Sequence, residues 1–208
     1  MKKRFNRYII MKIEYYYGIP SPFAYLGSLK FHFIAKKHNA EIIEKLCDLV
    51  GEIFAKTRGV PVPQKSSQRQ KYRLDEIKRW GEFLKIKINI KPKFFPPKDP
   101  HLPAKFTIAA NLLGTKVLFG HELLKQLWSE EKDISDEKNI EIISNKFKIN
   151  FEELSVLAKS EKVTKIYMDN TVEAINQNVF GAPTYIFNNE LFWGQDRLEF
   201  LERALKNA

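Results

Sequence analysis

The first patterned segment of the chain is an apolar and aromatic run over residues 13–17, which predicts a β-strand. Apolar residues then recur at three- and four-residue intervals over residues 20–38, the spacing of an amphipathic helix, and Pro22 suits its first turn. Residues 41–46 predict a second short strand, although the longer run over 41–56 also fits a helix. The N-terminal quarter therefore reads as strand, helix and strand.

The middle of the chain is dominated by helical patterns. Residues 57–67 contain Gly59, Pro61 and Pro63 and predict a loop, after which an amphipathic helix covers residues 74–84. Residues 85–95 alternate in polarity and end at a proline pair that breaks regular structure. Four more helices are expected, at about residues 103–113, 118–130, 135–147 and 150–159, the last two with cap signals at residues 133–136 and 150–153.

Strand patterns return near the C-terminus. A helix over about residues 162–178 is followed by two short apolar runs, 184–187 and 191–193, whose Asn-Asn connection predicts a hairpin. A final apolar helical pattern follows residues 194–197. The element order predicts an αβ domain in two parts, residues 11–58 and 162–208, interrupted by an all-helical insertion over 59–161. Residues 1–10 show neither period and are expected to be an unstructured extension.

Composition limits the classes of chemistry. The 208 residues are 44% hydrophobic and 29% charged, which is enough for one sizeable core. A single cysteine, Cys47, excludes an internal disulfide and any intramolecular dithiol cycle. No apolar run reaches the length of a membrane span and no signal-peptide pattern is present, so we expect a cytoplasmic protein.

The charge is strongly positive, and we read it mainly as a solvated face. The formal net charge is +10, from 35 basic and 25 acidic residues, and much of the excess lies between residues 65 and 98. The basic segment shows neither aromatic residues alternating with basic ones along a strand nor a recognisable DNA-recognition helix. We therefore expect no nucleic-acid partner. A basic rim would also suit a small anion. The four histidines show no metal-ligand spacing, and we expect no metal.

Three short segments carry candidate chemistry. In the first, residues 21–24, Ser21 and Ala24 occupy the two cysteine positions of a Cys-x-x-Cys motif at a predicted helix N-terminus. Unpaired N–H groups and the positive end of the helix dipole stabilise a thiolate at such a place. The segment thus suggests a site for a sulfur anion that the chain does not itself carry. Taken alone, however, Ser21 is better explained as a helix cap.

The second segment is residues 181–184, where Pro183 opens a predicted strand. A cis peptide before Pro183 would leave the N–H and C=O groups of Ala182 free to pair with an extended peptide-like ligand. A trans proline at the start of a strand is the simpler alternative.

The third segment is residues 194–197, a turn leading into the last helix. Free amides there would hold a carboxylate while Asp196 pairs with an ammonium group, which together match the head group of an α-amino acid. The alternative is that Asp196 only complements the helix dipole and pairs with Arg197.

Taken together, the three segments resemble one family. Residues 16–27 are similar to the Ser-Pro-aromatic-x-Tyr-Leu opening of 2-hydroxychromene-2-carboxylate isomerases and kappa-class glutathione transferases, and residues 178–184 and 190–201 resemble their closing segment. Arg79-Trp80 and residues 133–136 fit the middle of the family pattern. The resemblance extends over about residues 11–205.

The resemblance implies a thioredoxin-like, DsbA-related domain with a helical insertion, and glutathione as the bound thiol. It implies that Ser21 hydrogen-bonds the glutathione sulfur and favours its thiolate, and that Ala182, before a cis Pro183, holds the cysteinyl backbone. Gln195 and Asp196 would take the γ-glutamyl end. A homodimer is expected by analogy with the family.

The chain departs from the family pattern in the loop after the second strand. Relatives typically carry Asn in a Thr-Gly-Asn-x-Pro-Pro stretch, where this chain has Gly59, and a Lys ahead of the next helix, where Arg69 is the candidate replacement. Arg keeps the charge but not the geometry of Lys. Arg69 is nevertheless retained as a glutathione-binding candidate.

The leading functional hypothesis is glutathione-dependent isomerisation of a 2-hydroxychromene-2-carboxylate-like acid to its open-chain trans-o-hydroxybenzylidenepyruvate form. A thiolate would add to the conjugated substrate, the locked bond would rotate, and elimination would return the thiol. Phe23, Lys65 and Lys71 are substrate-binding candidates, and the basic loop with Lys65, Arg69 and Lys71 is a candidate for the substrate carboxylate. The alternatives are a kappa-like transferase or peroxidase acting on aromatic electrophiles, and a non-catalytic module that binds extended peptides along the strand edge beside Pro183.

Overall fold

The computed structural model describes residues 11–114 and 118–208. The expectation that residues 1–10 form an unstructured extension lies outside the described residues. Within them, a four-stranded sheet has the order β2-β1-β3-β4, formed by β1 (Lys12–Tyr17), β2 (Glu41–Leu46), β3 (Thr184–Phe187) and β4 (Glu190–Trp193). All four predicted strands are therefore present and belong to one sheet.

The register joins the two ends of the chain. Strand β1 runs parallel to β2, with Lys12 opposite Glu41 and Tyr17 opposite Leu46, and antiparallel to β3, with Tyr16 opposite Thr184. Strands β3 and β4 form the predicted hairpin, closed at Phe187 and Glu190. Both central residues of its turn, Asn188 and Asn189, have positive φ, as a two-residue hairpin requires.

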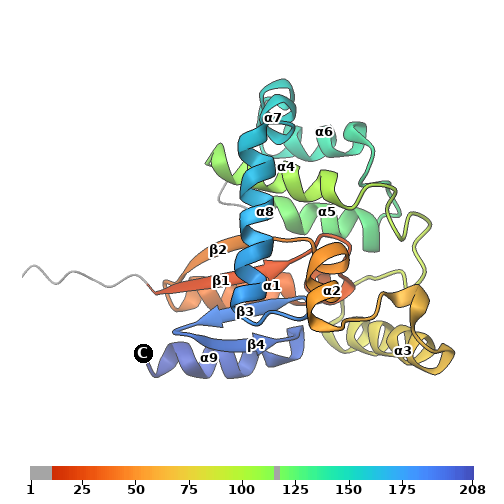
Figure 1. The fold of residues 1–208 in the computed structure, drawn as a ribbon, viewed down its shortest axis with the longest axis vertical. Helices are drawn as coiled ribbons and strands as arrows, with labels where there is room; N and C mark the ends of the chain where they lie inside the picture. Colours follow the sequence, from red (N-terminus) through yellow and green to blue (C-terminus); the bar gives the residue numbers. More distant parts are fainter. Residues whose placement is uncertain (1–10, 115–117) are drawn as a thin grey trace, which may run out of the picture.

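Helices cover both faces of the sheet (Figure 1). α1 (Pro22–Lys37) and α9 (Leu198–Lys206) lie on the face that carries the Tyr15 side chain, and α8 (Glu161–Asn176) crosses the face that carries Tyr16. Tyr15 packs on Phe31 of α1 with ring centroids 4.8 Å apart, and Tyr16 donates a hydrogen bond to Glu173 of α8. The alternation of strand side chains thus divides the core into two layers.

The helical insertion lies between β2 and β3 in sequence and beside α1 and α8 in space (Figure 1). Asp136 and Asn150 cap two of its helices, as the sequence predicts, by accepting N–H groups at 3.0 Å. The α-helices of the insertion are α3 (Ser67–Leu84), α4 (His101–Leu112), α5 (Phe119–Trp128), α6 (Glu137–Lys146), which Asp136 caps, and α7 (Phe151–Ala158), which Asn150 caps. The arrangement agrees with the αβ domain and helical insertion expected from the sequence.

The structure resolves two ambiguous segments. After β2 the chain forms a π-helical turn, η1 (Leu49–Ile53), and a short α2 (Phe54–Thr57), so the run over residues 41–56 is strand first and helix afterwards. The alternating residues 85–95 form no strand. Instead, the Tyr25 hydroxyl donates to Lys87 O at 3.1 Å and Asn89 N–H donates to Trp128 O at 2.6 Å, which fixes this segment against α1 and α5.

Some apolar residues of the helical patterns are exposed. Phe33 in α1 is 66% exposed and Phe83 in α3 is 75% exposed, although both fit the expected apolar stripes. Periodicity defines a stripe, but the neighbouring elements decide how wide a part of it is covered. None of the helices in residues 11–114 and 118–208 is both long and apolar enough to cross a bilayer.

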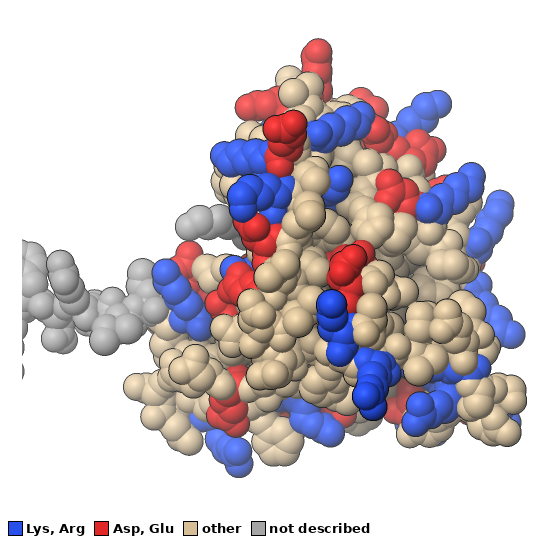
Figure 2. Space-filling model, in the orientation of Figure 1, with Lys and Arg blue, Asp and Glu red and all other residues tan. Residues whose placement is uncertain are grey.

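The charged side chains are interspersed on the face seen in Figure 2, where basic and acidic groups lie next to one another. Among the described residues, Lys146 pairs with Glu122 at 2.6 Å and Lys159 with Glu137 at 2.7 Å. Exposed pairs of this kind contribute little stability individually, so we interpret these charges as solvated surface.

Candidate active site

Ser21 is both a helix cap and the centre of the candidate site. Its Oγ accepts the Ala24 N–H at 3.2 Å, and it donates to the carbonyl oxygen of Ala182 at 3.4 Å. The cap predicted as a simple alternative is therefore present, and so is a contact with a segment 161 residues away. Because the contact with Ala182 is long, the hydroxyl proton is held weakly and is available to a stronger acceptor.

The Ala182–Pro183 peptide is cis, as the family resemblance implies, and the trans alternative is wrong. The carbonyl of Pro183 accepts the Gly194 N–H at 2.9 Å, which connects this bend to the turn before α9. Thr184 Oγ1 donates to Gly181 O at 2.8 Å and fixes the approach to the bend. Ser21, Ala182 and the 194–197 turn thus lie along one continuous line of hydrogen bonds.

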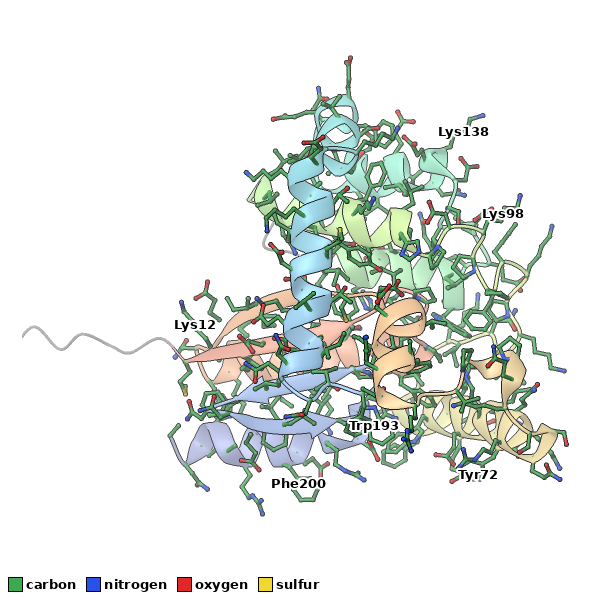
Figure 3. The ribbon with its side chains drawn as sticks, viewed as in Figure 1. Lys12, Tyr72, Lys98, Lys138, Trp193 and Phe200 are labelled. Carbon is green, nitrogen blue, oxygen red and sulfur yellow. The ribbon has the colours of Figure 1, made fainter. Side chains whose placement is uncertain are left out.

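Trp193 is a neighbour of this bend that sequence reasoning missed. Its indole lies against Gly181, where any Cβ would collide with the ring nitrogen, and it packs edge-on to Phe180 with centroids 4.8 Å apart. Figure 3 shows Trp193 at the end of β4 on the side of the sheet where α2 and α3 lie. The sequence indicates this packing only through Gly181, whose lack of a side chain leaves room for the indole.

Gln195 is placed more deeply than expected. It is only 7% exposed and lies against α1 at Gly27, where an added Cβ would come within 2.6 Å of Gln195 Cβ. The Oε1 atom is buried and has no hydrogen-bond partner among the described residues. A buried acceptor without a donor is costly, and the Tyr185 hydroxyl, which is also buried and unpartnered among the described residues, borders the same position of Gly27.

Asp196 pairs with Arg197 at 2.7 Å, the surface pair that the simpler alternative expects. Both side chains are substantially exposed, so the pair is weak and a ligand cation could replace Arg197. Burial, and after it the charge of Asp196, raises the pKa of Tyr185. The Asp196 carboxylate therefore acts on the same interior region that contains Gln195.

The predicted substrate-binding residues Phe23, Lys65 and Lys71 and the glutathione-binding candidate Arg69 differ in burial. Phe23 is half-buried in the first turn of α1, and Lys65 is half-buried just before α3. Arg69 and Lys71 are both exposed on α3. Burial, and then the charges of Arg73 and Arg69, lowers the pKa of Lys65. Lys65 and Arg69 therefore lie in one cationic cluster, and its third member is Arg73 rather than Lys71.

Sequence reasoning missed Arg73, although it follows Arg69 by one helical turn. Its guanidinium lies 5.2 Å from the ring centroid of Phe95 and 5.8 Å from that of Trp128. Neither aromatic partner lies near Arg73 in sequence, so only the folded chain shows this stacking.

Gly59, the departure from the family pattern, has a steric explanation. A Cβ at this position would collide with the ring of Phe54. The loop is therefore packed around the absence of a side chain, and an Asn here would displace that ring.

The two other reactive groups near the sheet are buried. Burial, and then Asp48, raises the pKa of the Cys47 thiol to about 12, so this cysteine is a poor nucleophile. Burial lowers the pKa of His121 to about 4, and His121 forms a 2.6 Å hydrogen bond with Ser28 in the interface between α1 and α5. Both groups are buried in the interior, so neither serves as a reactive group of the candidate site. Among the described residues, no cluster of acidic, histidine or cysteine side chains is suited to a metal ion.

The arrangement offers three kinds of contact to a ligand. A hydroxyl at a helix N-terminus, a backbone bend next to it and an orphaned buried acceptor beside a carboxylate would suit, in this order, a thiolate, a peptide backbone and an ammonium-bearing head group.

Comparison with characterised proteins finds isomerases and kappa-class glutathione transferases, the two groups that the sequence resembles. The chain is 24% identical to a 2-hydroxychromene-2-carboxylate isomerase of Pseudomonas sp. (strain C18), over 96% of this chain and 92% of that protein. It is 22% identical to glutathione S-transferase kappa 1 of Caenorhabditis elegans, over 94% and 91% of the two chains. At these identities the likeness is distant.

Solved structures show the same fold. A 2-hydroxychromene-2-carboxylate isomerase superposes with a TM-score of 0.77 at 23% identity, covering 95% of both chains. The cytosolic disulfide reductase DsbM from Pseudomonas aeruginosa, solved with GSH, has a TM-score of 0.66 at 15% identity, covering 94% of this chain and all of the other. The family model of the DSBA-like thioredoxin domain matches residues 12–206. The chain is therefore a member of the DSBA-like thioredoxin domain family, with its helical insertion between β2 and β3.

Proposed function

We propose that this protein is a glutathione-dependent isomerase that converts 2-hydroxychromene-2-carboxylate-like aromatic acids to open-chain trans-o-hydroxybenzylidenepyruvate-type products. The observation that carries the proposal is the position of Ser21, whose hydroxyl caps α1 and reaches Ala182 beside the cis peptide. The distant likeness to isomerases of this type supports it.

Bound glutathione would supply the thiolate nucleophile that the chain itself lacks. Ser21 would turn its proton from Ala182 O to the sulfur, while its oxygen stays fixed by the Ala24 N–H. One charge-assisted hydrogen bond of this kind is worth about 1.5 to 3 kcal/mol, and the N-terminus of α1 adds to it. Ser21 would therefore favour the charged form of the thiol.

The remaining candidate residues would position the peptide. Ala182 would pair through its backbone with the central residue, as an added strand does. Gln195 Oε1 and the Asp196 carboxylate would take the ammonium end, which satisfies the orphaned acceptor. We also propose residues 11–58 and 162–208 as the thioredoxin-like domain that holds glutathione and residues 59–161 as the insertion that selects the second substrate.

The decisive experiment is an ultraviolet titration of the thiol of bound glutathione. We expect Ser21→Ala to raise its pKa by about one to two units relative to the wild type, because the loss of about 1.5 to 3 kcal/mol of thiolate stabilisation corresponds to that shift.

Ser160→Ala is the matched control. Ser160 caps α8 by accepting the Val163 N–H at 3.3 Å, so its substitution also removes a serine cap, but on a helix outside the site. It should leave the thiol pKa unchanged. An unchanged pKa in Ser21→Ala as well would remove Ser21 from this role.

A second candidate is conjugation of glutathione to aromatic electrophiles, or peroxide reduction, supported by the distant likeness to three kappa-class transferases. Assaying the purified protein with the chromene acid and with a chloronitroaromatic separates the two, since turnover of only the second compound favours a transferase. Calorimetry tests both, because binding of an extended peptide without any binding of glutathione would contradict either enzyme.

A further inference from the structure

Three cations gather where the loop before α3 meets that helix. Gln70 Nε2 donates to Lys65 O at 2.8 Å and to Pro63 O at 3.4 Å, which holds the loop against the first turns of α3. Arg69 and Arg73 follow one helical turn apart, on the same side of the helix. The charges of both arginines act on Lys65, so the three cations form one electrostatic cluster.

No carboxylate in the described part of the chain neutralises this cluster. The ion pairs found there include none made by Lys65, Arg69 or Arg73. Arg79, further along the same helix, does pair with Glu76. Like charges held together without a counterion are unfavourable, so an anion would relieve their repulsion.

Arg73 is also oriented by aromatic side chains. Phe95 and Trp128 lie on its guanidinium at 5.2 and 5.8 Å, which restrains a side chain that is otherwise flexible. The indole N–H of Trp128 is buried and has no acceptor among the described residues. Trp128 is fully buried, so the half-buried ring of Phe95 is the aromatic group that a ligand at this guanidinium could contact. A pre-oriented guanidinium suits a carboxylate.

The cluster is connected to α1 through the loop over residues 85–95 and through α5. Tyr25, one helical turn after Ser21, donates to Lys87 O, and the same loop is bound to Trp128 O through Asn89. Trp128 and Phe95 in turn hold Arg73. A chain of direct contacts therefore leads from the helix that Ser21 caps to the cluster.

We propose that Arg73, with Lys65 and Arg69, forms a subsite for the carboxylate of an aromatic acid and that Arg73 determines this specificity. The inference rests on the proposed function, in which such an acid is the second substrate. Glutathione also carries carboxylates, and Arg69 is itself a glutathione-binding candidate. The half-buried ring of Phe95 on the Arg73 guanidinium favours the aromatic acid at Arg73.

The test compares binding of trans-2-hydroxycinnamate with that of its uncharged primary amide, by calorimetry at low ionic strength. The wild type should bind the acid more tightly than the amide. Arg73→Gln should weaken binding of the acid about tenfold or more, as expected for loss of one charge-assisted hydrogen bond, and leave the amide unaffected. Arg73→Lys should be intermediate, because it keeps the charge and loses the planar fork.

Lys78→Gln is the control, since it removes one positive charge from the same helix at an exposed position paired with Glu82. It should leave the affinity for the acid within about twofold of the wild type. Equal loss of acid and amide binding in Arg73→Gln would indicate a structural role, and no preference of the wild type for the acid would also overturn the proposal.

Titration with glutathione separates this proposal from the previous one. Loss of glutathione affinity in Arg73→Gln, with acid binding unchanged, would assign the cluster to glutathione and overturn the subsite. A wild type that binds the acid through Arg73 but binds no glutathione would retain the subsite and contradict the proposed isomerase.

Discussion

The two helices that border the candidate site are built differently. Nine of the sixteen residues of α1 are buried, whereas only Ile77 and Gly81 are buried in the eighteen residues of α3. α1 is enclosed by the sheet, α5 and α9, while α3 lies at the periphery (Figure 1). The Ser21 end of the candidate site is therefore fixed by the core, and the cluster of Lys65, Arg69 and Arg73 belongs to a region that contributes little to stability.

This difference suggests a division of labour. A group that stabilises charge must be held rigidly, and Ser21 is held by its own helix and by the bend at Ala182. Peripheral elements tolerate substitution, so they are where substrate preference changes most easily. Tyr72 on α3 is 61% exposed, and Figure 3 shows it projecting from that helix.

The largest expected effect comes from matched phenylalanine truncations in the two helices. Phe31→Ala in α1 should lower the free energy of unfolding by about 3 to 5 kcal/mol, because the ring is fully buried. Phe83→Ala in α3 should lower it by about 0.5 kcal/mol or less, because the ring is 75% exposed. Urea unfolding measures both, and similar losses would contradict the contrast between the helices.

The second prediction concerns acid stability of the α1–α5 interface. Burial depresses the pKa of His121 to about 4, so its stabilising effect is complete above the unfolded pKa of about 6.5 and is lost as pH falls through 4. The loss amounts to about 3 kcal/mol, since each unit of pKa shift corresponds to about 1.4 kcal/mol. Measuring unfolding at several pH values should show a steeper decline in the wild type than in His121→Asn; parallel curves would show that other groups control acid stability.

A third prediction compares an introduced thiol with the native one. Ser21→Cys should create a thiol with a pKa at least about one unit below 8.5, because it lies at the N-terminus of α1. Cys47, whose pKa is about 12, should remain unreactive in the native protein. Alkylation rates with iodoacetamide across pH give the pKa of the introduced thiol. The wild type is the control, because it reports any reaction of Cys47. A pKa of about 8.5 or higher for the introduced thiol would refute the electrostatic argument for Ser21.

The smallest effect is expected at the departure from the family pattern. Gly59→Asn should lower stability by about 1 kcal/mol, because the new side chain would displace the half-buried ring of Phe54. Thermal unfolding measures it. Unchanged stability would mean that the ring moves aside freely and that the glycine is not required by packing.

Local signals in the sequence were enough to predict most of the secondary structure and to select the candidate site residues. Strand and helix periods, the Asn-Asn turn and the caps at Asp136 and Asn150 depend only on neighbours within a few residues. The same holds for Ser21 in place of a cysteine. The resemblance of the terminal segments supplied the fold.

Which side chains share a site, in contrast, depends on the folded chain. Lys71 also carries a positive charge and is two residues from Arg73, yet Arg73 is the one that stacks on Phe95 and Trp128 and acts on Lys65. Gln195 is buried against Gly27, and residues 85–95 are fixed by hydrogen bonds to α1 and α5 instead of by a sheet. Each outcome depends on which distant segment covers a residue, and periodicity carries no information about that because packing partners are chosen by the whole fold.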